Sequence, residues 1–126
     1  MATIRSFLKW AGNKYTSLNT ILPAFSLERT RLIEPFTGSG VIFMNTHYEE
    51  YLLAENNADL IALFQFVQEE GIVFIDYCER LFTAEHNTSG VYYASRNEFN
   101  TTIDLRRKAA LFLYLNRHCL IDNTMC

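Results

Sequence analysis

The sequence predicts an incomplete α/β fold, in which one strand–helix–strand unit is followed by a helical region. Three features support this interpretation. A short apolar run at 31–34 leads into a glycine-containing turn, a second apolar run at 51–54 ends next to an acid, and apolar side chains recur at helical spacing after residue 57. Two parallel strands do not make a self-sufficient sheet, because both faces and both edges need cover. We therefore expect the sheet to be unfinished.

The first apolar run enters the turn Phe36-Thr37-Gly38-Ser39-Gly40, and an apolar helix is expected from about Val41 to Thr46. The second run, Tyr51–Ala54, is followed directly by Glu55. Glycines let a backbone come close to a ligand, a helix N-terminus offers free N–H groups, and a carboxylate can accept hydrogen bonds from ribose hydroxyls. The pattern predicts half of a nucleotide-binding unit, but a Gly-x-Gly turn alone does not distinguish a binding loop from an ordinary turn.

The segments that flank this unit are expected to be a loop and helices. Residues 7–15 mix aromatic, basic and turn-forming side chains, which predicts a loop that leads into a short helix ended by Pro23. After the second strand, Asn56 and Asn57 are good helix-start residues, and a helix should follow as far as Glu70. Gly71 breaks this pattern.

The remainder of the chain also predicts helices. The segment 72–82 has apolar residues on one helical face, and its first residues, 72–75, fit a strand as well. A loop is expected at 87–90, followed by helices at about 91–100 and 109–115. No internal repeat or low-complexity segment appears in the sequence.

The composition is that of an ordinary globular protein of one domain or part of one, with 126 residues, 49% hydrophobic and 20% charged. No apolar run approaches the ~20 residues of a membrane span, and the first six residues do not form a signal peptide. We therefore expect a cytoplasmic protein without a membrane partner. Three cysteines and three histidines are scattered without metal-ligand spacing, so no metal site is expected.

The charge is unevenly distributed along the chain. The net charge is −3, and nine acids but a single base, Arg80, lie between His47 and Glu85. Basic residues collect near the N-terminus and after Arg96. Because phosphate neutralisation dominates the affinity of nucleic-acid-binding proteins, an acidic total argues against strong DNA binding by these residues alone.

Taken together, the motifs resemble those of the DNA adenine-N6 methyltransferases of the Dam type, from about Phe7 to His118. Four blocks in the family's order carry the resemblance: 7–14 (FLKWAGNK), 32–40 (LIEPFTGSG), 53–61 (LAENNADLI) and 113–118 (LYLNRH). The resemblance implies an incomplete Rossmann-like S-adenosylmethionine-dependent methyltransferase fold. It assigns residues 1–70 to a partial cofactor-binding region and 71–118 to the helical start of the DNA target-recognition region.

The resemblance also assigns roles to individual residues. It implies S-adenosylmethionine as cofactor and double-stranded DNA as substrate, with methyl transfer to adenine N6, typically in GATC. The implied cofactor-binding residues are Trp10, Lys14, Phe36, Gly38, Gly40 and Glu55. Glu55 replaces a more usual aspartate, and Asn13 stands where a second glycine is common. Lys9 is implied to face the DNA, whereas Arg96 and Arg117 fit either a phosphate contact or a structural ion pair.

Two departures from the family pattern change the expectation for activity. The catalytic Asp-Pro-Pro-Tyr motif is absent, because the only prolines, Pro23 and Pro35, are not adjacent. Agreement with the motifs ends at His118, so 119–126 read as an aberrant tail of a truncated or frameshifted chain. We expect no catalytic residue in this sequence and an inactive fragment.

Two other interpretations remain at this point. A non-catalytic module could bind the cofactor or modulate a methyltransferase, and it could self-associate through the unfinished sheet edge. The third interpretation, half of a nucleotide-binding oxidoreductase, has less support, because the third glycine of the dinucleotide fingerprint is missing.

Overall fold

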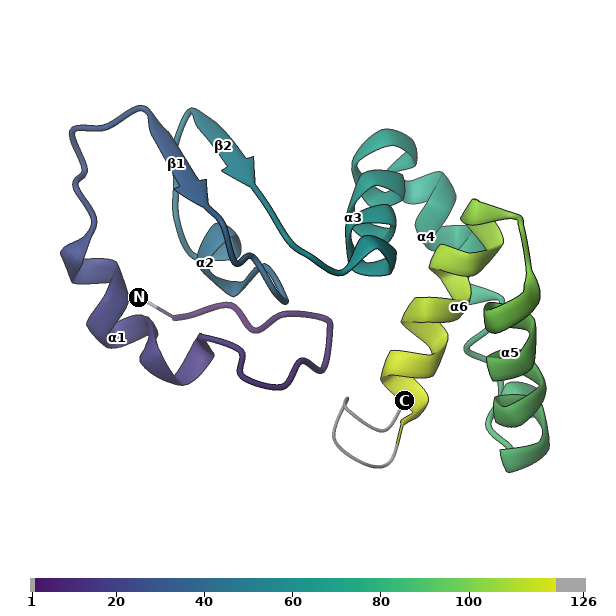
Figure 1. Cartoon of the computed structure of the whole chain (residues 1–126). Helices are drawn as coiled ribbons and strands as arrows, with labels where there is room; N and C mark the ends of the chain where they lie inside the picture. The colour runs from purple at the N-terminus through teal and green to yellow at the C-terminus, as the bar shows by residue number, and fades with distance from the viewer. Residues whose placement is uncertain (1, 120–126) are drawn as a thin grey trace. The chain divides into compact units, whose positions relative to one another are not determined.

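A computed structural model of the chain describes residues 2–119. The chain divides into two compact units between Asn56 and Asn57 (Figure 1). The first unit contains a small parallel sheet with short helices, and the described part of the second contains only helices. The expected mixture of helices with one strand–helix–strand unit is therefore confirmed at this level.

In the first unit the sheet has two strands, β1 (Arg31–Glu34) and β2 (Glu50–Leu53), which run parallel. The connection between them contains the one-turn helix α2 (Val41–Met44) (Figure 1). The strands pair Arg31 with Glu50 and Glu34 with Leu53, so the carboxyl ends of both strands meet at one edge. No third strand joins the two within residues 2–119.

One face of this sheet is covered and the other is exposed. Leu32 packs against a core of Leu18, Val41 and Ile42, which α2 and the short helix α1 (Leu18–Ile21) supply. One-turn 3₁₀ segments at Tyr15–Ser17 and Leu22–Ala24 flank α1, so the helical stretch runs one residue past Pro23. On the opposite face, the side chains of Ile33 and Leu52 are 60% and 56% exposed.

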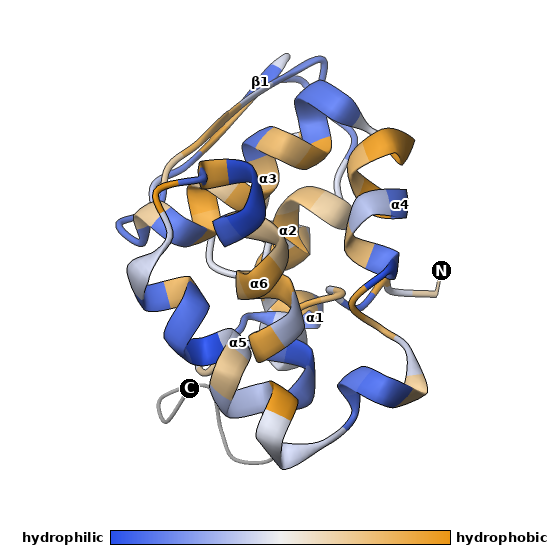
Figure 2. Cartoon of the chain, turned by 90° about the vertical axis from the view of Figure 1, so that its right-hand side faces the viewer, coloured by the Kyte–Doolittle hydropathy of each residue, from blue (hydrophilic) through white to orange (hydrophobic). Residues whose placement is uncertain are grey.

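The second unit packs four helices: α3 (Ala58–Glu70), α4 (Ile72–Glu79), α5 (Ser89–Thr101) and α6 (Leu105–His118). A short 3₁₀ segment lies at Ala84–His86. Helix α6 contacts the other three helices and supplies the fully buried Ala110, Leu111 and Tyr114. Each helix carries both polar and apolar residues, as Figure 2 shows by hydropathy, which is the pattern of helices that bury one face.

Side chains at the helix starts explain where these elements begin. The side chain of Asn57 accepts hydrogen bonds from the N–H groups of Asp59 and Leu60 at the start of α3. Thr88 and Asp104 cap α5 and α6 in the same way. Because the first N–H groups of a helix have no partner within it, such caps stabilise the helix ends. Gly71, with φ +56°, separates α3 from α4.

Two details differ from the sequence-based expectation: residues 89 and 90 begin α5 instead of ending a loop, and the last helix starts at Leu105 instead of at about residue 109. Residues 72–75, for which the sequence fits both a helix and a strand, are helical. Helix α3 belongs to the second compact unit, whereas the expected region boundary lay after residue 70. The expected functional regions stay predictions, and most of the tail at 119–126 lies outside the described residues.

No helix in the described part of the chain is long and apolar enough to cross a membrane.

Candidate functional site

The turn after β1 brings the backbone into a conformation that requires glycine. Gly38 has φ +53° and Gly40 has φ +78°, both in the left-handed region that side chains disfavour. The N–H of Gly40 donates to the carbonyl of Thr37 (3.0 Å), and Gly40 is the N-cap of α2. The N–H of Thr37 in turn donates to the carbonyl of Ala54 (3.0 Å), so the turn is attached to the end of β2.

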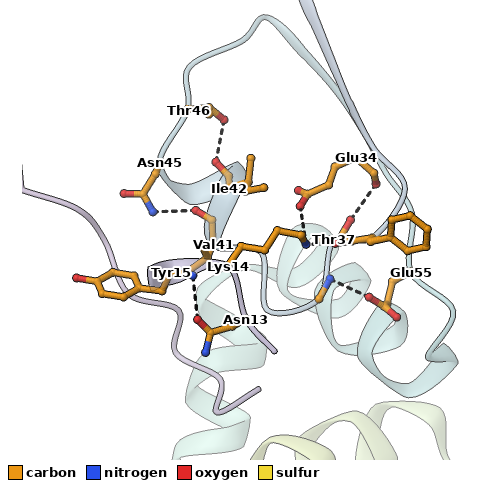
Figure 3. Close-up of polar contacts among 12 residues, drawn as sticks. Asn13, Lys14, Tyr15, Glu34, Thr37, Val41, Ile42, Asn45, Thr46 and Glu55 are labelled. Atoms are coloured by element: carbon orange, nitrogen blue, oxygen red, sulfur yellow. Dashed lines mark hydrogen bonds and ion pairs between the residues drawn. The ribbon is translucent and has the colours of Figure 1, made fainter. Parts of the chain in front are cut away.

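The carboxylate of Glu55 lies on this turn. Its Oε2 accepts a hydrogen bond from the N–H of Gly38 (2.8 Å), and its Oε1 accepts one from the N–H of Asn56 (2.9 Å). Figure 3 shows the first of these contacts, with Glu55 pointing toward the turn. The acid that the sequence predicts to bind ligand hydroxyls therefore fixes the glycine turn in this structure.

Lys14 connects the opening loop to the end of β1. Its Nζ donates to Oε1 of Glu34 (3.2 Å) and to the backbone carbonyl of Phe36 (Figure 3). Glu34 is only 6% exposed, and its Oε2 is buried without a hydrogen-bond partner among the described residues. Burial raises the pKa of Glu34, and the hydrogen bond and charge of Lys14 oppose that rise.

The indole of Trp10 lies against Gly38. A Cβ atom at Gly38 would be 3.3 Å from Cδ1 and 3.4 Å from Nε1 of Trp10, and the shorter distance is tighter than nine in ten natural Cβ contacts. Two features therefore disfavour a side chain at Gly38, its φ angle and the closeness of the ring. Ser6 adds a further attachment of the opening segment, because its hydroxyl donates to the carbonyl of Ser39 (2.6 Å).

These groups surround a cavity of about 230 Å³ in the first unit. Its walls include five of the six residues implied to bind the cofactor: Trp10, Lys14, Phe36, Gly38 and Glu55. The sixth, Gly40, does not line the cavity and acts as the N-cap of α2. Sequence reasoning missed Thr37 and Ser39, which also line the cavity, and Glu34, which holds Lys14.

The residues expected to contact DNA occupy separate elements. Lys9 is exposed on the opening loop of the first unit. In the second unit, Arg96 is exposed on α5, and Arg117 is exposed in the last turn of α6. The basic run at 106–108 pairs with acids of α3 and α5: Arg106 with Glu70, Arg107 with Glu98, and Lys108 with Asp59.

The cavity combines groups that suit a nucleoside carrying a positive centre. An indole face attracts a cation, and a carboxylate at the strand end accepts hydrogen bonds from hydroxyls. Lys14, which lines the cavity, pairs with a second carboxylate, Glu34, whose Oε2 has no hydrogen-bond partner among the described residues. At about 230 Å³ the cavity is somewhat smaller than the ~300–1,000 Å³ typical of sites that enclose a small molecule. It therefore fits part of such a ligand. No group of three or more metal-ligating side chains occurs among the described residues.

Comparison with known proteins identifies the family. A family model described as "D12 class N6 adenine-specific DNA methyltransferase" matches residues 10–124, past the point at His118 where the motif resemblance ends. DNA adenine methylase from Serratia marcescens is 46% identical over 125 residues, covering 97% of this chain and 44% of that protein.

Two further relatives give the same result. DNA adenine methylases from Haemophilus influenzae and Escherichia coli are 43% and 44% identical over 114 and 117 residues, each covering 90% of this chain. The matches cover 40% and 41% of those proteins, so the chain spans about two fifths of the length of these relatives. These matches contradict the oxidoreductase interpretation. With nearly the whole chain matched, it belongs to the D12 class N6 adenine-specific DNA methyltransferase family.

Proposed function

We propose that the first unit forms part of the S-adenosylmethionine site of a DNA adenine methyltransferase with an incomplete Rossmann-like fold. The observation that carries this proposal is the convergence of Trp10, Lys14, Phe36, Gly38 and Glu55 on one cavity. These residues come from the opening loop, the glycine turn and the end of β2, which are separated in sequence by up to 45 positions (10 to 55). Residues that the sequence motifs indicate thus line one cavity.

Each wall of the cavity has a role in this proposal. The cofactor supplies an electrophilic methyl group on a sulfonium centre. The face of Trp10 would stabilise the positive charge, and the Glu55 carboxylate would accept hydrogen bonds from the ribose hydroxyls. Lys14 would attract the carboxylate of the methionine end, while its contact with Glu34 keeps the ammonium in place. Phe36, whose side chain is 76% exposed, would lie on the adenine ring.

The second unit, in the same proposal, is the helical start of the region that recognises DNA. The target would be the N6 amine of an adenine, in GATC as in the intact family, with Lys9, Arg96 and Arg117 near the backbone. Methyl transfer needs groups that accept hydrogens from this weakly nucleophilic amine. The 126 residues have no Asp-Pro-Pro-Tyr motif, so we propose that they bind cofactor but do not methylate DNA on their own.

A titration of the purified chain with S-adenosylhomocysteine tests the cofactor site. Trp10 is the single tryptophan, so emission excited at the red edge of absorption reports on the cavity alone. We expect a saturable change that Glu55→Ala abolishes and that Glu49→Ala, an exposed carboxylate of the same unit, preserves. A flat titration of a chain that unfolds cooperatively would contradict the proposal. Incorporation of labelled methyl into a GATC duplex by the pure chain would contradict the proposed inactivity.

A second candidate function, a non-catalytic module that pairs with a methyltransferase or with itself, rests on the uncovered face of the sheet. Ile33 and Leu52 are adjacent in the strand register and more than half exposed. Exposed apolar sheet surface and unpaired strand edges favour association. Sedimentation of the chain and of its Ile33→Lys variant tests this candidate. A concentration-dependent dimer that the variant abolishes would support it, and a monomer in both would refute self-association.

A further inference from the structure

A second cavity of the first unit, on the other side of the opening segment from Lys14, has the side chains of a phosphate site. It has a volume of about 400 Å³, and its lining includes Thr3, Arg5, Asn13, Tyr15 and Asn19. No acidic side chain lines it, and the sequence has no Asp or Glu before Glu28. The consecutive side chains of Lys14 and Tyr15 point in opposite directions, Lys14 toward Glu34 and Tyr15 away from it (Figure 3).

Arg5 is the charged group of this cavity, and its backbone is anchored on both sides. The N–H of Ile4 donates to Oδ1 of Asn45 (2.7 Å), and Nδ2 of Asn45 donates to the carbonyl of Ile4 (2.8 Å). On the other side, the Ser6 hydroxyl donates to the carbonyl of Ser39 (2.6 Å). Arg5 therefore projects from a segment that two long-range attachments hold against α2 and the glycine turn.

The guanidinium itself is also positioned. Its Cζ lies 4.4 Å from the centre of the Tyr15 ring, a cation–π contact, and the Tyr15 hydroxyl is 3.0 Å from the Thr3 hydroxyl. Arg5 is exposed, and no carboxylate pairs with it among residues 2–119. An arginine with a restricted rotamer, whose N–H donors no carboxylate of the described residues occupies, loses little entropy when it binds an anion.

We propose that this cavity binds a backbone phosphate of DNA, with Arg5 as the principal contact. Arginine, hydroxyl and amide side chains are the groups that contact phosphate oxygens in protein–DNA complexes, and the cavity presents all three. This inference rests on the proposed function for its ligand, because the DNA substrate proposed there supplies the phosphodiester. A contact of this kind fixes the position of the duplex and carries no sequence information.

Binding of fluorescent duplexes at several salt concentrations tests the proposal. We expect Arg5→Met to weaken binding about fivefold, equally for duplexes with and without GATC, as for an exposed ion pair. The slope of log K against log[salt], between about 50 and 200 mM, should fall in magnitude by about one. Arg29→Met removes the same charge from an exposed position outside this cavity and should leave the slope unchanged. Arg5→Lys should restore the slope and part of the affinity.

Two results would overturn the proposal: equal effects of Arg5→Met and Arg29→Met, or no binding of any duplex by the unmodified chain at about 50 mM salt. Titration of the same variants with S-adenosylhomocysteine distinguishes a failure of the phosphate site from a failure of the proposed cofactor site. Arg5 does not line the cofactor cavity, so Arg5→Met should bind S-adenosylhomocysteine normally, which also shows that it folds. Weaker duplex binding by Arg5→Met with unchanged S-adenosylhomocysteine binding would support the phosphate site. A flat S-adenosylhomocysteine titration of the unmodified chain would contradict the cofactor site.

Discussion

Replacing Gly38 with alanine tests two features of the glycine turn, the positive φ of Gly38 and the closeness of the Trp10 ring. Gly38 has φ +53°, and an added Cβ would lie 3.3 Å from Cδ1 of Trp10. Gly12 offers a matched control, since its φ is +69° and nothing lies within 4 Å of the position that a Cβ would take. Both alanine variants carry the cost of a left-handed backbone, and only Gly38→Ala pushes against the indole.

The magnitudes follow from these two terms. The left-handed conformation costs an alanine about 1–2 kcal/mol, and the lower entropy of the unfolded chain offsets about 0.4–1 kcal/mol of that in both variants. Overpacking typically costs about 1–3 kcal/mol, and the half-buried Trp10 can move, so the lower end applies. We expect Gly38→Ala to be about 1 kcal/mol less stable than Gly12→Ala.

Urea unfolding followed by Trp10 emission measures this difference directly, because the single tryptophan lies in the unit that contains both glycines. The emission maximum of the folded state should shift in Gly38→Ala, whose ring is displaced, and stay unchanged in Gly12→Ala. Equal midpoints and identical spectra for the two variants would refute the argument that Trp10 lies against the turn.

Three further predictions concern other parts of the chain. Burial raises the pKa of Glu34, so the Glu34 carboxyl holds its proton more tightly in the folded than in the unfolded state. The free energy of unfolding therefore falls as the pH rises from the unfolded-state pKa of Glu34 through its folded-state pKa. The Glu34→Gln variant has no carboxyl to titrate at this position. The unfolding free energy of the variant minus that of the unmodified chain should therefore increase from about pH 4 to about pH 7. Parallel pH profiles of the two proteins would contradict this prediction. Asn57→Ala should lower the free energy of unfolding by about 1 kcal/mol, because it removes the side chain that caps α3. Asn56→Ala, at the neighbouring position, leaves this cap in place and should not lower it, and the urea midpoints of the two variants test the difference. Burial raises the pKa of the Cys78 thiol to about 11, so the thiolate that reacts with iodoacetamide is scarce at pH 8. Peptide mass spectrometry should show modification of Cys78 at least ~100-fold slower in the folded than in the urea-unfolded chain. Comparable rates in the two states would contradict this prediction.

Much of the local structure could be predicted because local sequence determines it. The apolar runs of β1 and β2 flank a turn whose glycines adopt positive φ, and Asn57 caps the helix that it was expected to start. The residues 72–75 could not be assigned, because a run of β-branched and aromatic residues fits both a strand and a helix. Tertiary packing decides for the helix: Phe74 and Cys78, four positions apart, are buried, as on one helical face.

The contacts of the charged residues were beyond sequence reasoning, because their partners lie far away along the chain. The basic run at 106–108 could have been a DNA contact, yet its three side chains pair with acids 9 to 49 residues earlier. Glu34 gave no signal beyond its position next to Pro35, although it is the partner of Lys14. A sequence indicates which residues carry charge, while the fold decides which charges remain for a ligand.

Glu55, a departure from the family pattern, combines an observed contact with the glycine turn and a proposed role in ligand binding. The glycine turn follows β1 and Glu55 follows β2, and parallel pairing places these two strand ends at the same edge of the sheet. A glutamate there reaches the N–H of Gly38, so its Oε2 is already a hydrogen-bond acceptor before any ligand arrives. Each carboxylate oxygen has a second lone pair, so ribose hydroxyls can bind without breaking this contact. In the proposed cofactor site, the additional methylene, compared with the more usual aspartate, would therefore let the acid hold the turn and the ligand at once.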